Sequence, residues 1–190
     1  MAICSGRTVI ITGAGGGLGR AYALAFAAAG ANVVINDIRA DAAQDVAGEI
    51  RANGGRAIAN SDDITTLATA GRIVEAAVAA FGEVHVLVNN AGVLRDRMFI
   101  SLSEEDWDMV MRVHLKGHYC LANLLGRRWR DLAKAGTPVD ARIINTSSGA
   151  GLQGSVGQSN YSAAKGGIAA LTLVQAAELA RYGITANALA

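Results

Sequence analysis

The chain has 190 residues, which is the length of a single domain. Hydrophobic residues make up 52% of it and charged residues 17%, so the composition excludes a disordered chain. Seventeen basic and 16 acidic residues leave a net charge of +1, which does not favour nucleic acid as a partner.

Short β-branched runs alternate with longer alanine-rich segments along the chain. We expect strands at residues 7–12, 31–36, 56–60, 84–88, 141–146 and 184–189. We expect helices at residues 18–29, 41–52, 65–81, 103–131 and 160–182. The strands are continuously apolar, as in a sheet that helices cover on both faces. The pattern predicts one α/β domain over residues 1–190, a doubly wound parallel sheet of the Rossmann type.

Neither the N-terminal residues nor any apolar run indicates a membrane or secretory segment. The longest largely apolar run, residues 21–35, contains Gly30 and Asn32 and is shorter than the ~20 residues that a membrane helix needs. Cys4 and Cys120 form no C-x-x-C pair, and free thiols are typical of a reducing compartment. We therefore expect a cytoplasmic protein with no membrane partner.

A glycine-rich loop follows the first predicted strand. It reads T-G-x-x-x-G-x-G through Gly13, Gly17 and Gly19, with Gly16 and Leu18 inside the pattern. Glycines let backbone N–H groups approach a pyrophosphate, and the N-terminus of the following helix favours negative charge. The loop predicts a dinucleotide site; the structural alternative is a turn that only packs the helix against the strand.

Acidic residues follow the second and third predicted strands. Asp37, followed by Ile38, lies where an acid accepts hydrogen bonds from the adenosine ribose. A carboxylate there repels a 2′-phosphate, so it favours NAD over NADP, although Arg39 is a nearby cation. Asp63, which precedes Ile64, has two interpretations from its spacing: it accepts from the adenine amino group, or it caps the next helix.

A tyrosine and a lysine are placed to work together on the helix at residues 160–182. Tyr161 and Lys165 are four residues apart and so project from one helix face. A tyrosine that exchanges protons near neutral pH needs a neighbouring positive charge, because a free phenol has a pKa of about 10. Ser148 and Thr146 lie at the end of the fifth strand, where such sheets present their ligands.

Together these motifs resemble the short-chain dehydrogenase/reductase family, over essentially all 190 residues. The matching segments are T-G-x-x-x-G-x-G at Thr12–Gly19, N-N-A-G at Asn89–Gly92, Ser148, and Y-x-x-x-K at Tyr161 and Lys165. The resemblance implies that Tyr161 transfers the proton, that Lys165 holds the nicotinamide ribose, and that Ser148 hydrogen-bonds the substrate oxygen. It also implies that Asn90, Ala91 and Gly92 line the cofactor cleft.

One position departs from the family pattern. His114 stands where the family usually places an asparagine, so the role of its side chain is open. The flanking segments resemble one branch of the family, the (3R)-hydroxyacyl-CoA dehydrogenase units of peroxisomal multifunctional enzyme type 2 and their bacterial relatives, which share this histidine. His114 and His118 have a spacing that suits zinc, but no acid or cysteine completes a ligand set, and we expect no metal.

The sequence therefore predicts an NAD(H)-dependent enzyme that interconverts a secondary alcohol and a ketone, on a 3-hydroxyacyl-CoA or a hydroxysteroid. One alternative is a non-catalytic dinucleotide-binding sensor or partner subunit, and another is an NADP-dependent 3-oxoacyl reductase. The resemblance implies a homo-oligomer, a dimer or tetramer. The family's Pro-Gly motif after the sixth strand is absent, so we expect the C-terminal part of the domain to be missing.

The predicted catalytic residues are Ser148, Tyr161, Lys165 and His114. The predicted cofactor-binding residues are Gly13, Gly16, Gly17, Leu18, Gly19, Asp37, Ile38, Asp63, Ile64, Asn90, Ala91, Gly92, Thr146, Tyr161 and Lys165.

Overall fold

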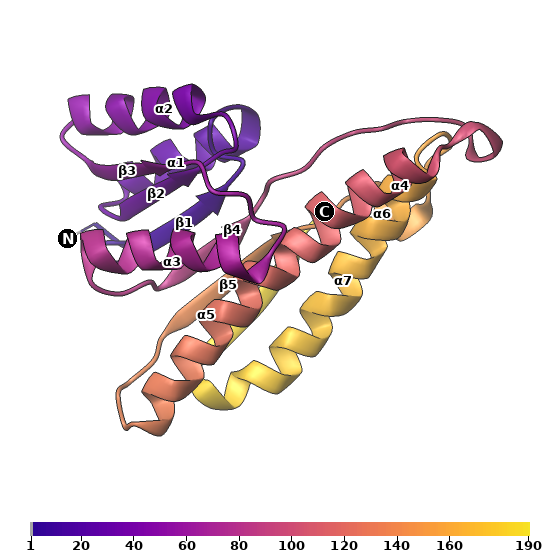
Figure 1. The fold of residues 1–190 in the computed structure, drawn as a ribbon. Coiled ribbons are helices and arrows are strands. Elements are labelled where there is room, and N and C mark those ends of the chain that lie inside the picture. Colours follow the sequence, from indigo (N-terminus) through magenta and orange to yellow (C-terminus); the bar gives the residue numbers. More distant parts are fainter. Residues whose placement is uncertain (1) are drawn as a thin grey trace.

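The computed structural model describes residues 2–190, which form a parallel six-stranded sheet with helices packed against it (Figure 1). The strands are β1 (Thr8–Thr12), β2 (Asn32–Asn36), β3 (Arg56–Asn60), β4 (Val86–Asn89), β5 (Ala141–Thr146) and β6 (Ile184–Leu189). Their order across the sheet is β3-β2-β1-β4-β5-β6, and all five pairings are parallel. This is the strand order of a dinucleotide-binding fold, which confirms the predicted class.

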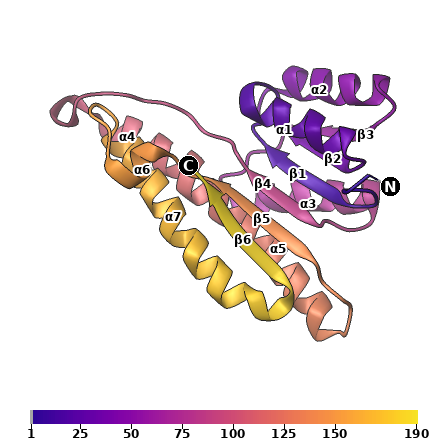
Figure 2. The same cartoon turned by 180° about the vertical axis from the view of Figure 1, so that it is seen from behind.

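Helices occupy both faces of the sheet. They are α1 (Gly17–Ala28), α2 (Ala40–Ala52), α3 (Leu67–Phe81), α4 (Glu104–Met111), α5 (Gly117–Lys134), α6 (Gly149–Gln153) and α7 (Ser159–Leu179). Helices α1 and α2 lie over one face of β1–β3, and α3, α5 and α7 lie on the other face (Figures 1 and 2). Within residues 2–190, no helix combines the length and the apolar character that crossing a bilayer requires.

The hydrophobic core is divided by the sheet into two clusters. Ile10 and Leu87 belong to the cluster under α3 and α5, whereas Val9 and Ile11 belong to the cluster under α1 and α2. Neighbouring residues of one strand point to opposite faces, so a strand buried on both faces must be apolar at every position. The indole of Trp129 anchors α5, because its Nε1 donates to the Val84 carbonyl at 2.7 Å.

Strands β5 and β6 have one face covered by helices and one more accessible face within the described residues. Buried and more accessible residues alternate along both strands: Ile143 and Ile184 are buried, whereas Thr185 and Asn187 are exposed. Figure 2 shows β6 with no helix in front of it. Within the described residues, helices therefore cover both faces of the central strands and one face of β5 and β6.

Two helices differ from their predicted bounds for local reasons. The helix expected at residues 103–131 is α4 and α5 joined by a π-helical segment, Arg112–Lys116, and it continues to Lys134. Helix α3 begins at Leu67 instead of residue 65, because the Thr66 side chain accepts from the N–H of Thr69 and caps the helix. The short helix α6 was not expected from the sequence.

Candidate active site

The glycine loop joins β1 to α1 at the point where the strand order reverses. Gly13 and Gly17 have φ of +63° and +52°, which side-chain-bearing residues rarely adopt. A Cβ on Gly13 would lie 2.8 Å from the Cα of Ala91, so the loop and the segment after β4 touch backbone to backbone. A Cβ on Gly17, in contrast, would meet nothing within 4 Å, and one on Gly16 would meet only the end of the Arg39 side chain, at 3.6 Å. The loop therefore leaves the N-terminus of α1 open to an anionic ligand.

The ends of β1 and β4 are held together by hydrogen bonds. The Thr12 hydroxyl accepts from the N–H groups of Asn90 and Ala91, both at 3.0 Å. The Asn90 side-chain amide donates to the carbonyls of Thr12 at 2.9 Å and Gly13 at 3.2 Å. These bonds place the predicted cleft residues Asn90, Ala91 and Gly92 directly beside the glycine loop.

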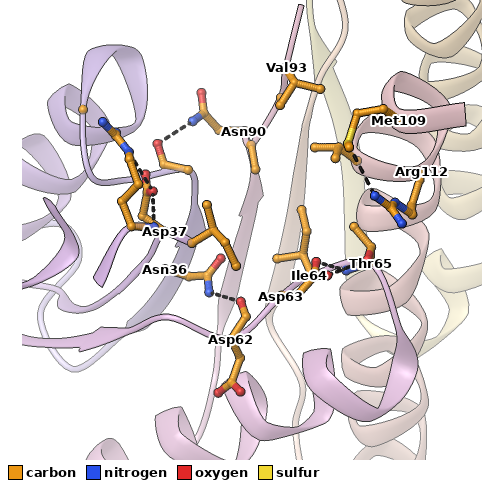
Figure 3. A pocket seen from close by; sticks show the side chains of 17 residues that line it. Asn36, Asp37, Asp62, Asp63, Ile64, Thr65, Asn90, Val93, Met109 and Arg112 are labelled. Carbon is orange, nitrogen blue, oxygen red and sulfur yellow. Dashed lines mark hydrogen bonds and ion pairs between the residues drawn. The ribbon is translucent and has the colours of Figure 1, made fainter. Parts of the chain in front are cut away.

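Asp37 lies at the end of β2 with its carboxylate directed at the glycine loop (Figure 3). One carboxylate oxygen accepts from the Gly15 N–H, and the other accepts from the Arg39 N–H, both at 3.0 Å. The Arg39 guanidinium forms a longer contact of 3.4 Å with the same carboxylate and is itself mostly exposed. The structure thus brings Asp37, the loop and Arg39 to one place, as the sequence predicts.

A pocket of about 590 Å³ opens beside these residues (Figure 3). Its lining includes the following predicted cofactor residues: Gly13, Gly16, Asp37, Ile38, Asp63, Ile64, Asn90, Ala91 and Gly92. Residues from α4 and the π-helical segment, Met109 and Arg112, form the opposite wall, and no sequence motif indicated them. Gly17, Leu18, Gly19, Thr146, Tyr161 and Lys165 are not among its lining residues.

Asp63 lines this pocket, but its carboxylate is used locally. One oxygen accepts from the Thr65 N–H and the other from the Thr65 hydroxyl, each at 2.8 Å. The Asp63 carboxylate thus stabilises the turn before α3, and the cap of α3 is Thr66 and not Asp63. Asp62 is held by Asn60 and Arg72, whose hydrogen bonds keep the pKa of its carboxyl below the usual value.

Lys165 is a buried cation in the first half of α7. Lys165 is only 2% exposed, and its ammonium group donates a hydrogen bond to the Thr146 carbonyl, with 2.5 Å between nitrogen and oxygen. Burial lowers the pKa of Lys165 from 10.5 to about 8. At pH 7 the lysine therefore remains mostly charged, in a place where its charge is not dispersed by water.

Tyr161 lies one turn before Lys165, between that lysine and His114. The Lys165 Nζ is 5.5 Å from the centre of the tyrosine ring. The His114 ring meets the tyrosine ring edge to face, with 5.2 Å between the centroids and 89° between the planes. The structure thus brings together three of the four residues predicted to be catalytic, from α7 and from the π-helical segment.

Ser148 follows β5 and begins α6. Its Oγ accepts from the Ala150 N–H at 3.2 Å, which makes Ser148 the N-cap of this short helix. Helix α6 packs closely on α7 at Gly151, where there is no room for a side chain: a Cβ there would lie 2.6 Å from the backbone nitrogen of Gly166. Ser148 is therefore fixed to the same helix that carries Tyr161 and Lys165.

One residue that sequence reasoning missed holds the region together. The amide of Asn160 is fully buried at the start of α7 and donates to the carbonyls of Arg95 at 3.0 Å and Asp106 at 3.3 Å. It thereby attaches the β4–α4 connection and α4 to the helix that carries Tyr161. The sequence shows only a polar residue directly before the Y-x-x-x-K motif, and its burial becomes visible in the structure alone.

The described residues fit a dinucleotide. The open glycine loop suits a pyrophosphate, the Asp37 carboxylate suits ribose hydroxyls, and Lys165 is a cation beside them on the same edge of the sheet. Within residues 2–190, no three or more His, Cys, Asp or Glu side chains are grouped as a metal site would need. His118 is buried, and burial together with the Lys165 charge lowers its pKa to about 3.

Comparison with known proteins identifies the family. A family model described as short chain dehydrogenase matches residues 7–190. The chain belongs to the short-chain dehydrogenase family. A short-chain dehydrogenase from Mycobacterium avium has the same fold, with a TM-score of 0.97 and 57% identity over 99% of this chain and 68% of that one.

Two curated relatives are similar over 97% of this chain. Hydroxyacyl-CoA dehydrogenase ChsB1 of Mycobacterium tuberculosis is 48% identical, and peroxisomal multifunctional enzyme type 2 of Mus musculus is 45% identical. The chain spans 60% of the length of the first and 25% of the second. The branch resemblance drawn from the motifs is confirmed by these relatives.

Proposed function

We propose that the protein is an oxidoreductase that interconverts a secondary alcohol and a ketone with NAD(H). The observation that carries this proposal is the buried Lys165 ammonium, 5.5 Å from the Tyr161 ring, on the same edge of the sheet as the open glycine loop. A nicotinamide cofactor, when bound, supplies or accepts the hydride. Family membership and the relatives named as dehydrogenases support the same reaction class.

In this proposal each catalytic side chain has one task. During alcohol oxidation the Tyr161 oxygen, as phenolate, takes the hydroxyl proton of the substrate, and during ketone reduction the phenol returns it. The Lys165 cation, 5.5 Å from the tyrosine ring, would bind the nicotinamide ribose. The Ser148 oxygen accepts from Ala150, which leaves its hydroxyl proton available to donate to the substrate oxygen.

We propose NAD rather than NADP as the cofactor because of Asp37. Its carboxylate is nearly buried and faces the glycine loop, so a 2′-phosphate at the adenosine ribose would meet a negative charge. The competing observation is Arg39, whose exposed guanidinium lines the same pocket and suits a phosphate. In Asp37→Asn, which keeps the shape but removes the charge, we expect the ratio of NADPH to NADH activity to rise at least tenfold.

We propose a 3-hydroxyacyl-CoA as the substrate, because ChsB1 carries the name hydroxyacyl-CoA dehydrogenase and is 48% identical. A hydroxysteroid is the second candidate.

We also propose a homo-oligomer that pairs through α5 and α7, because Leu173, Val174 and Tyr119 expose apolar surface on these helices. A cytoplasmic location is supported by cysteine usage: Cys120 and Cys4 pack on opposite faces of the sheet and form no disulfide with each other.

A substrate panel with the purified protein tests the reaction. NAD-linked oxidation of 3-hydroxyacyl-CoA thioesters, hydroxysteroids and simple secondary alcohols is followed by cofactor absorbance. We expect turnover on at least one thioester and a loss of about 100-fold or more in Tyr161→Phe. Tyr182→Phe, in the 3₁₀ turn Ala180–Tyr182 that follows α7, is the matched control and should retain activity. Tight NAD binding without any turnover would instead support a sensor or partner subunit.

A further inference from the structure

A π-helical segment places His114 inside the site. Arg112–Lys116 interrupts the otherwise continuous helix between α4 and α5, and His114 is its central residue. Single π-helical turns occur often at functional sites, because they redirect a side chain relative to a regular helix. Here the imidazole is buried, with 2% of the residue exposed, and it meets both the segment after β4 and helix α7.

One ring nitrogen of His114 ties the helix to the end of β4. Its Nε2 lies 3.0 Å from the Val93 nitrogen and 2.8 Å from the Val93 oxygen. A neutral imidazole accepts from the N–H in one tautomer and donates to the carbonyl in the other, so either tautomer makes a hydrogen bond to Val93. The ring fits there only because residue 92 is glycine: a Cβ on Gly92 would lie 2.3 Å from the His114 Cε1.

The same ring supports Tyr161. The edge-to-face contact, with centroids 5.2 Å apart, restricts the tilt of the phenol, whose other neighbour is the Lys165 ammonium. The second imidazole nitrogen, Nδ1, has no hydrogen-bond partner among the residues that the structure describes. His114 therefore links the backbone of the cofactor cleft to the proposed proton-transferring side chain.

The surroundings of His114 oppose a positive charge. Burial and the Lys165 ammonium lower the pKa of His114 to about 4, against the effect of the Val93 hydrogen bond. The other titratable neighbours are Tyr161 on α7 and His118 on α5, and the pKa of His118 is lowered to about 3. The imidazole is consequently neutral at neutral pH and is not poised to exchange a proton there.

We propose that His114 is a positioning residue, whose imidazole fixes the Val93 backbone and the Tyr161 ring relative to each other and does not carry the proton of the reaction. This inference rests on the oxidoreductase function proposed above. It accounts for the histidine at a position where the family usually has asparagine.

Two variants separate positioning from proton transfer. His114→Phe keeps a ring against Tyr161 but loses the bond to Val93, and His114→Gln places an amide where Nε2 now lies. We expect kcat to fall at least tenfold in His114→Phe, with an unchanged pH profile, and to recover at least threefold in His114→Gln. A Phe variant within twofold of wild type, or one in which a limb of the pH profile disappears, would overturn the proposal.

Measurements without turnover distinguish failure of this inference from failure of the proposed function. In the cofactor-free protein, NMR titration should show the His114 imidazole neutral down to pH 5, and a titration between pH 6 and 7 would overturn the inference. The Val93 amide should exchange with solvent at least tenfold faster in His114→Phe than in wild type, and unchanged exchange would overturn it too. If the Phe variant does not fold, the Gln variant and the wild-type titration decide. Absence of wild-type turnover counts only against the proposed function.

Discussion

The buried charge of Lys165 makes a prediction about stability that is independent of any substrate. The folded protein lowers the lysine pKa from 10.5 to about 8, so it penalises the charged form relative to the unfolded chain. The difference of about 2.5 pH units corresponds to about 3 kcal/mol at pH 7, since one unit is 1.36 kcal/mol. Between pH 8 and 10.5 the unfolded chain binds more protons, so stability rises with pH in this window.

Lys165→Met removes the charge and keeps a side chain of similar length. The penalty should fall from about 3 kcal/mol at pH 7 to about 1.4 kcal/mol at pH 9.5 in wild type, and it should be absent from the variant. Wild type should therefore gain about 2 kcal/mol relative to Lys165→Met over this pH range. Urea denaturation of both proteins at pH 7 and pH 9.5 measures the difference of differences, in which titrating groups that do not interact with Lys165 cancel.

A double difference below about 0.5 kcal/mol, or one of opposite sign, would refute the reasoning, because the ammonium would then not be desolvated. The variant also differs from wild type in stability at every pH, because it loses the hydrogen bond to Thr146, which contributes about 1.5–3 kcal/mol for a charged donor. Only the slope with pH isolates the charge. The variant should also lose the proposed activity while remaining folded.

Two further predictions concern the histidines. The pKa of His118 is about 3 in the folded protein and 6.5 in the unfolded chain, so the free energy of unfolding decreases as the pH falls below 6.5. Between pH 7 and pH 5 this decrease is about 2 kcal/mol, and urea denaturation should show that His118→Leu removes it. Gly92→Ala should lower the free energy of unfolding by about 1–3 kcal/mol because the new methyl group collides with His114. Gly149→Ala, whose methyl group would face open space, should leave the stability unchanged. In a His114→Ala background the effect of Gly92→Ala should nearly vanish, and persistence of the full effect would exclude the collision.

The sequence alone was sufficient for features that depend on neighbours along the chain. The glycine loop between β1 and α1 follows from φ values that only glycine adopts easily, as at Gly13 and Gly17. The shared face of Tyr161 and Lys165 follows from helix periodicity. The parallel, doubly wound class of the sheet follows from the regular alternation of strands and helices, which leaves few topologies. These parts of the prediction were confirmed with small shifts of element ends.

Other features appeared only when segments distant in sequence were packed together. His114 contacts Val93 and Tyr161 from a π-helical segment, and no local pattern predicts where such a turn directs its ring. The same holds for Asn160, whose amide donates to two carbonyls on other elements.

The electrostatic character of the site belongs to this second group. A lysine four residues after a tyrosine is common in ordinary helices; what distinguishes Lys165 is that the fold removes it from water and sets its ammonium against the Thr146 carbonyl. Spacing along the chain is fixed by local backbone geometry, whereas desolvation is a property of everything packed around a group. The sequence therefore determined which side chains share an edge of the sheet, and only the tertiary structure decided which of them stay charged.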